Sequence, residues 1–156
     1  MAKQEQLLRL KLNGNYLYVQ RLNRDKERIG KRTKWEIRER STLPRELFYQ
    51  VRGFLQRSIK KFGTKSPDGL SRAGRVALLQ AGRAFGCKIR NGSARADLYW
   101  SKGGVRLFAW QVHTEYLDER RVKELRGSKA LLRLAVVLRG TGFFEIIPLR
   151  TKVQRS

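Results

Sequence analysis

Acidic side chains, cysteine and histidine are all scarce in this chain of 156 residues. It holds 13 Asp and Glu against 36 Lys and Arg, with one Cys and one His. The single cysteine, Cys87, excludes an internal disulfide and a zinc site built from several cysteines. No apolar stretch approaches the ~18 residues of a membrane span, and the first residues do not have the pattern of a secretory signal. We therefore expect a cytoplasmic protein with no membrane partner.

The shortage of acids leaves a formal net charge of +23. Residues 1–62 hold 17 basic and 6 acidic side chains, and residues 63–156 hold 19 and 7. A basic tail would concentrate the charge at one end, so the folded surface itself is expected to be cationic. A compact domain with this charge repels itself, which favours a polyanionic partner. Nucleic acid is the first candidate. Charge alone would also suit an acidic protein or the surface of an anionic membrane, although we expect no membrane partner.

The pattern of apolar residues predicts one mixed sheet with flanking helices, an α/β or α+β domain over residues 42–156. Turn residues such as Asn91-Gly92 and Lys102-Gly103-Gly104 separate the elements. We expect Thr42 to cap the first helix and Ser71 to cap the second. The expected helices are 42–61, 71–84 and 115–127, and the expected strands are 87–90, 96–101, 105–112, 130–138 and 143–149.

Residues 1–41 are predicted to form a separate basic N-terminal hairpin or arm. Residues 6–22 are expected to be extended, with a hairpin turn at Asn13-Gly14-Asn15. Residues 21–40 hold nine basic and four acidic side chains and few large apolar ones, so we expect this arm to become ordered on its partner. Trp35 lies among arginines and lysines, a setting that favours stacking on an unpaired base.

Residues 96–113 resemble the PD-(D/E)XK nucleases, including the archaeal Holliday junction resolvases. The matching residues are Ala96-Asp97-Leu98-Tyr99-Trp100, then Gly103-Gly104, then Ala109-Trp110-Gln111-Val112-His113. The resemblance implies a restriction-endonuclease-like fold in which Asp97 and Gln111 hold Mg²⁺ and orient the attacking water. His113 stands at the position of the family's Lys, and Glu46 would be the upstream acid.

Other features of the same region favour a site without catalysis. Between residues 47 and 96 there is one acid, Asp68, among eleven bases, whereas a two-metal site needs several carboxylates. In the alternative interpretation Asp97 caps a segment or pairs with a nearby Arg, and Gln111 is a hydrogen-bonded polar group of the core. His113 is then a histidine at the end of a strand or on the surface.

A second resemblance, over residues 86–149, is to the catalytic-type domain of archaeal tRNA-splicing endonucleases. The similar segments are 86–90, 96–99, 122–137 and 143–147. This family cleaves RNA without a metal, using Tyr, His and Lys. Lys129 falls on the family's Lys and Tyr99 falls near its Tyr, but no His stands at Val105 or Arg106. The resemblance therefore implies a structural subunit whose C-terminal strand pairs with a partner subunit or a second copy.

These observations favour an RNA-binding, non-catalytic component of a ribonucleoprotein, such as a ribosomal protein, or of an RNA-processing complex. The alternatives are a metal-dependent nuclease that acts on branched or single-stranded DNA and a DNA-binding protein without catalysis. We expect no cofactor, and Mg²⁺ only under the nuclease alternative. The residues expected to contact nucleic acid are Arg24, Arg28, Lys31, Arg32, Lys34, Trp35, Arg38, Arg40, Arg52, Arg57, Lys60, Lys61, Arg72, Arg75, Lys88, Arg90 and Arg95.

Overall fold

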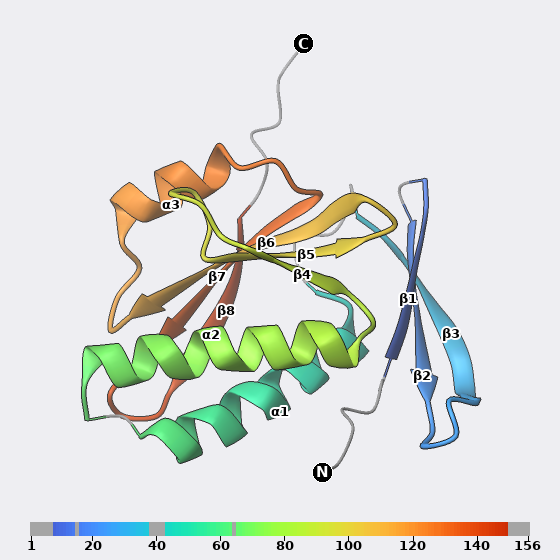
Figure 1. Cartoon of the computed structure of the whole chain (residues 1–156), viewed down its shortest axis with the longest axis horizontal. Helices are drawn as coiled ribbons and strands as arrows, with labels where there is room; N and C mark the ends of the chain where they lie inside the picture. Colours follow the sequence, from blue (N-terminus) through green and yellow to red (C-terminus); the bar gives the residue numbers. More distant parts are fainter. Residues whose placement is uncertain (1–7, 15, 38–42, 64, 150–156) are drawn as a thin grey trace.

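The chain folds into two β-sheets and three helices, as a computed structural model shows for residues 8–14, 16–37, 43–63 and 65–149 (Figure 1). This α+β architecture confirms the fold class expected from the sequence. The helices are α1 (Arg45–Phe62), α2 (Pro67–Ala84) and α3 (Glu119–Arg126). The strands are β1 (Leu8–Asn13), β2 (Tyr16–Leu22), β3 (Arg28–Glu36), β4 (Lys88–Asn91), β5 (Leu98–Lys102), β6 (Val105–Thr114), β7 (Leu132–Leu138) and β8 (Phe144–Leu149).

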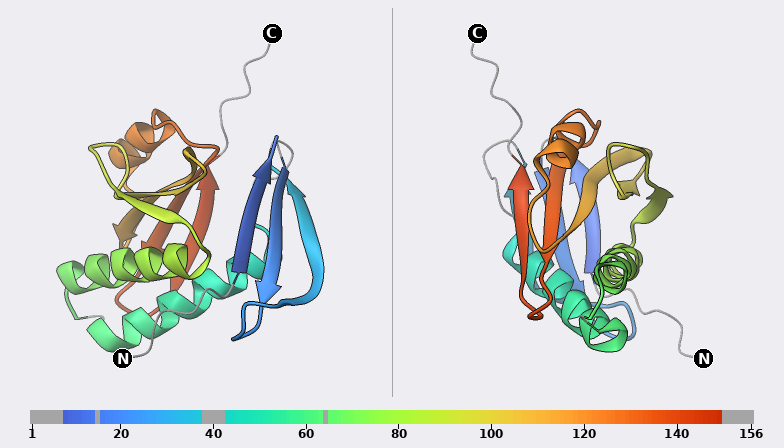
Figure 2. Two further views of the ribbon diagram at one scale, coloured as in Figure 1. Left: turned by 45° about the vertical axis from the view of Figure 1, so that its right-hand side comes forward. Right: turned by 90° about the vertical axis from the view of Figure 1, so that its left-hand side faces the viewer.

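The larger sheet has the strand order β4-β5-β6-β7-β8. All neighbours are antiparallel except β6 and β7, which are parallel and joined through α3. Helix α2 covers one face, where the Trp100 indole donates to the carbonyl of Leu78 at 2.9 Å. Helix α3 covers part of the other face, where Val122 and Leu125 pack with Tyr99 (Figure 2). Strands β4 and β8 are the edges of this sheet.

The smaller sheet is an antiparallel meander in the order β1-β2-β3. Its inner face carries Leu8, Leu17 and Trp35, which belong to the same hydrophobic core as Leu47 of α1 and Trp100 of β5. The expectation of an arm too poor in apolar residues to pack is therefore wrong at Trp35, which is fully buried. That the arm becomes ordered on its partner stays a prediction. The expected boundary between two domains, at residues 41 and 42, lies outside the described residues.

Helix α2 begins earlier than the sequence predicted, and helix α3 begins later. Helix α2 starts at Pro67, not after Ser71, because the Ser66 hydroxyl accepts a hydrogen bond from the Gly69 amide at 3.0 Å and proline suits the first turn. Helix α3 starts at Glu119, not Glu115, because Glu115 has a φ of +69° and Asp118 is the N-cap. Thr42, the expected cap of α1, is outside the described residues, and α1 begins after Pro44.

Helix α2 lies very close to the sheet at two glycines. A Cβ atom at Gly82 would come within 2.6 Å of the Trp100 Nε1 atom and would also meet Ile89, and one at Gly74 would come within 2.7 Å of Val112. Trp100 is fully buried and packs edge-on against Phe85 at 5.6 Å between ring centroids. No helix among the described residues is long and apolar enough to cross a membrane.

We expect Gly82→Ala to lower the free energy of unfolding by up to about 2 kcal/mol, because overpacking costs about 1–3 kcal/mol and the gain in helix propensity is only about 1 kcal/mol. The matched control is Gly53→Ala in α1, where the new Cβ would make an ordinary contact with Arg57 at 3.4 Å. That variant should be more stable by about 0.5–1 kcal/mol. Urea unfolding measures both changes, and equal stabilisation by the two substitutions would contradict the close packing at Gly82.

Candidate nucleic-acid interface

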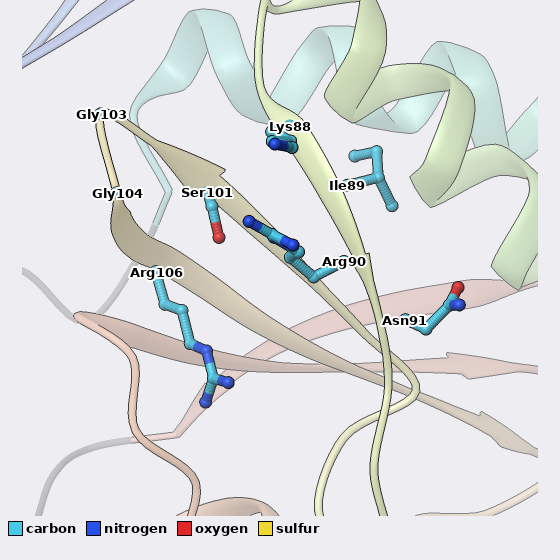
Figure 3. Close-up of a pocket in the computed structure, with 8 residues that line it drawn as sticks. All are labelled: Lys88, Ile89, Arg90, Asn91, Ser101, Gly103, Gly104 and Arg106. Carbon is cyan, nitrogen blue, oxygen red and sulfur yellow. The ribbon is translucent and has the colours of Figure 1, made fainter.

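An open groove of about 760 Å³ lies along the edge strand β4 and the turn between β5 and β6. Its lining includes three cationic side chains, those of Lys88, Arg90 and Arg106, and no acidic one. Figure 3 shows these cations together with Ser101 and the turn residues Gly103 and Gly104, while Ile89 points toward α2. The groove therefore offers only positive charge to a ligand, which suits phosphate groups.

The pleat of the sheet explains why the cations gather on this face. Ile89 pairs with Trp100, and both side chains face α2. Because alternate residues of a strand point to opposite faces, Lys88 and Arg90 must point away from α2. Lys88 pairs with Ser101, which pairs in turn with Arg106 on β6, so the three cations share one face. The Arg106 guanidinium also lies 4.4 Å from the centroid of the Tyr99 ring.

The structure leaves nearly all of the predicted phosphate-contacting cations exposed. Besides those of the groove, they lie on the three-stranded sheet, on the outer sides of α1 and α2, and beside α3. Arg38 and Arg40 lie outside the described residues. The exposed set is Arg24, Arg28, Lys31, Arg32, Lys34, Arg52, Arg57, Lys60, Lys61, Arg72, Arg75, Lys88, Arg90 and Arg95.

The prediction that Trp35 stacks on a base is wrong. Its side chain is fully buried in the core, because residue 35 of β3 faces inward opposite Leu17. Arg106 was not among the residues predicted to contact nucleic acid. Because it is a single charged residue within the apolar run of β6, the sequence could have indicated that this position faces solvent.

Asp97, the first acid of the nuclease resemblance, already accepts hydrogen bonds from other groups of the chain. Its Oδ2 atom accepts a hydrogen bond from the Val112 amide at 2.6 Å and another from Arg121 Nη2 at 2.8 Å. The same guanidinium donates through Nη1 to the Val112 carbonyl at 2.6 Å. Arg121 thus places a positive charge between a carboxylate and a carbonyl oxygen, the two kinds of oxygen ligand that a divalent cation would need here.

Gln111 and His113 lie beside this ion pair, and their polar atoms bond to each other and to the backbone. The Gln111 amide donates to the carbonyls of Arg95 and Arg121 at 2.9 and 2.7 Å. Its Oε1 lies 2.8 Å from His113 Nε2, and the Asp118 amide donates to His113 Nδ1 at 3.0 Å. Since Nδ1 accepts, the proton of the neutral ring is on Nε2 and is donated to Gln111.

His113 lies next to the last residue of β6, which confirms the expected position at the end of a strand. With 2% of its surface exposed it is buried, so a surface position is wrong for it. Burial lowers the pKa of His113, and the charge of Arg121 acts in the same direction. The charges of Asp97 and Asp118 oppose this shift. The ring is therefore held neutral by desolvation and by an amide donor at Nδ1.

Glu46, the expected upstream acid, is in the first turn of α1. No hydrogen bond joins it to Asp97, Gln111 or His113 within the part of the chain that the structure describes. Over the same residues, no cluster of three or more His, Cys, Asp and Glu side chains is placed to hold a metal ion. The structure thus brings together three of the four predicted nuclease residues and adds Arg121 to them.

The residues of the splicing-endonuclease resemblance are not assembled around His113. Tyr99 is buried, and its hydroxyl lies 3.2 Å from Ser93 Oγ. Tyr99 pairs with Ala109, four residues before His113 on β6, a separation of about 13 Å along the strand. Lys129 is exposed in the loop before β7. The expected pairing of the C-terminal strand with a partner stays a prediction for β8.

Comparison of the chain with models of protein families, with curated proteins and with solved structures found no match in any of the three. Both family resemblances of the sequence therefore stay predictions.

The unfolding free energy should fall as the pH drops from about 7.5 to 5.5. The pKa of His113 lies below its ordinary value of about 6.5 in the folded chain, so the unfolded state binds more protons below that pH. The loss is at most about 1.4 kcal/mol per pH unit from one group, and it ends once the pH is below the folded pKa. Denaturant unfolding across this range measures it.

His113→Asn is the control for this prediction, because its side-chain oxygen can still accept from the Asp118 amide but does not titrate. The variant should have a shallower pH dependence over the same range, whatever its absolute stability. An unchanged slope in the variant would show that other groups cause the effect.

Proposed function

We propose that the protein binds RNA without cleaving it, as a component of a ribonucleoprotein or an RNA-processing complex. The observation that carries the proposal is the groove along β4, which three cations line and no acid enters, in a chain of net charge +23. Electrostatic attraction to phosphates is the main source of affinity for such surfaces. Exposed cations on both sheets and on α1 and α2 extend this surface well beyond the groove.

The arrangement at Asp97 supports binding without metal-dependent catalysis. Asp97 Oδ2 already accepts two hydrogen bonds, and the Val112 carbonyl accepts one from Arg121. A divalent cation at these oxygens would have to displace the guanidinium or tolerate its like charge. The Gln111 oxygen is directed to His113. The four side chains therefore stabilise the junction of β5, β6 and α3.

A metal-dependent nuclease acting on branched or single-stranded DNA is the second candidate. One observation favours it: Asp97 and Gln111, far apart in sequence, lie together at neighbouring ends of β5 and β6, with His113 beside them. This is the juxtaposition that the resemblance to the PD-(D/E)XK nucleases implies. Under this candidate Arg121 would swing away when Mg²⁺ and substrate bind.

Replacing the groove cations together, as Lys88→Ala, Arg90→Ala and Arg106→Ala, should weaken binding to structured RNA by at least about tenfold near physiological salt. The plot of log affinity against log salt should become less steep by about 2, because each lost phosphate contact contributes about 0.7–0.9 to the slope. Fluorescence anisotropy at several salt concentrations measures both quantities, with junction DNA as a parallel ligand.

The matched control removes three cations from α3, as Arg120→Ala, Lys123→Ala and Arg126→Ala. These residues are exposed, and the change in net charge is the same. Affinity should fall far less than in the groove variant. Equal losses in the two variants would mean that diffuse charge, not the groove, holds the ligand, and failure to bind any nucleic acid would refute the proposal.

Incubation with Mg²⁺ should leave structured RNA, junction DNA and single-stranded DNA intact. Asp97→Ala should then keep the affinity for nucleic acid, since Asp97 lies outside the groove lining. Gel electrophoresis of labelled substrates, with Mg²⁺ or with EDTA, is the measurement. Cleavage that EDTA prevents and Asp97→Ala abolishes would replace the proposal by the nuclease candidate.

A further inference from the structure

The outer face of the three-stranded sheet combines exposed cations with two tyrosine rings. The inner face is apolar and buried, with Leu10, Leu17 and Trp35 in the core. The alternate positions point the other way, and β1, β2 and β3 each contribute to that outer face. We call the following residues the tyrosine face: Arg9 and Lys11 of β1, Tyr16 and Tyr18 of β2, and Arg32, Lys34 and Glu36 of β3.

The strand register fixes the arrangement of this face. Tyr18 stands between Lys11 on one side and Lys34 on the other. Tyr16 stands in the next row, opposite Glu36. The Arg32 guanidinium lies 4.3 Å from the centroid of the Tyr18 ring, and the Lys34 ammonium lies 4.1 Å from that of Tyr16. Four cations and one carboxylate therefore surround two aromatic rings.

The two rings have a spacing that suits unpaired bases. Tyr16 and Tyr18 are two residues apart on one strand, so their attachment points differ by about 6.6 Å along it. Every base has a π-face that can stack on a tyrosine ring or on an arginine plane. Bases inside a duplex stack on one another and cannot do this. The cations on β1 and β3 flank the rings on both sides, where the phosphates of a bound strand would run.

We propose that the tyrosine face binds an unpaired stretch of RNA, with two bases stacked on Tyr16 and Tyr18 and the phosphates held by Arg9, Lys11, Arg32 and Lys34. This inference rests on the proposed function and names the form of RNA that the protein takes. In the free protein the cations of β3 cover the rings, and such contacts are weak at exposed sites. The phosphates draw these side chains aside and open the rings to the bases.

The tyrosine face and the groove are distinct surfaces on two different sheets. Strand β1 contacts β5, and the turn that follows β5 lines the groove. The lining of the groove includes no aromatic side chain, whereas the tyrosine face adds two aromatic rings. We therefore assign phosphate binding to both surfaces and base stacking to the tyrosine face alone.

Tyr16→Leu and Tyr18→Leu should each weaken binding of an oligouridylate of about ten nucleotides by about tenfold, whereas Tyr16→Phe and Tyr18→Phe should keep the affinity because the ring remains. Anisotropy of the labelled oligonucleotide is the measurement. Inorganic polyphosphate, which has no bases, should bind the leucine variants as it binds the original protein. Tyr116→Leu, at an exposed tyrosine outside the sheet, should leave the affinity for both ligands unchanged.

A second measurement uses the unchanged protein, so that it does not depend on the folding of a variant. Oligouridylate that contains 5-iodouridine should form photocrosslinks at Tyr16 or Tyr18. Crosslinks found only in β4 to β6 would overturn the inference. Equal weakening of oligouridylate and polyphosphate by the leucine variants would also overturn it, as would tighter binding of duplex RNA than of the single strand.

The two proposals fail in different ways. If no nucleic acid binds, the proposed function is refuted. If RNA binds and the groove variant weakens it, but the leucine variants do not, the proposed function holds and stacking on the tyrosine face is refuted. If single-stranded DNA of the same length binds as tightly as the RNA, the choice of RNA is refuted, but the proposal that bases stack on the tyrosine face still holds.

Discussion

The indole of Trp100 lies where helix α2 comes closest to the larger sheet. Its Nε1–H donates to the Leu78 carbonyl, and its ring packs on Phe85, Phe108 and Trp110. There is room for this ring because residue 82 of α2 has no side chain. Once Trp100 and its partner Ile89 face the helix, the pleat directs Lys88, Arg90 and Ser101 to the opposite face. The buried packing thus determines where the positive charge of the groove stands.

A second structural constraint is the ion pair of Asp97 and Arg121. It joins the start of β5 to the first turns of α3, and its guanidinium also holds the Val112 carbonyl. Gln111 and His113 complete the network with hydrogen bonds to each other and to the backbone. Because the chain holds few acidic side chains and many basic ones, the side chain next to a carboxylate in this region is more often an arginine than a second carboxylate. The same excess of cations that favours nucleic acid therefore also neutralises the carboxylate of Asp97.

Much of the secondary structure could be predicted from the sequence, because apolar periodicity and turn residues mark the elements locally. The five strands of the larger sheet and the three helices all exist near their expected positions. The errors have local causes. Ser66 caps α2 ahead of the expected Ser71, and the left-handed backbone of Glu115 delays α3. The scarcity of large apolar residues in 21–40 suggested that this segment could not pack. One large side chain, that of Trp35, is enough to anchor β3 in the core.

The sequence by itself determined the charge, the order of the elements and the scarcity of carboxylates, because composition and local patterning are properties of the chain. It also indicated Asp97, Gln111 and His113 as a group. Only the tertiary structure decided what those residues contact, because Arg121 reaches Asp97 from a helix 24 residues further along the chain. The fold likewise decided which aromatic residues face solvent. Strand pairing turns Trp35 inward and leaves Tyr16 and Tyr18 among cations on the outer face, and inward or outward orientation depends on register, which composition does not specify.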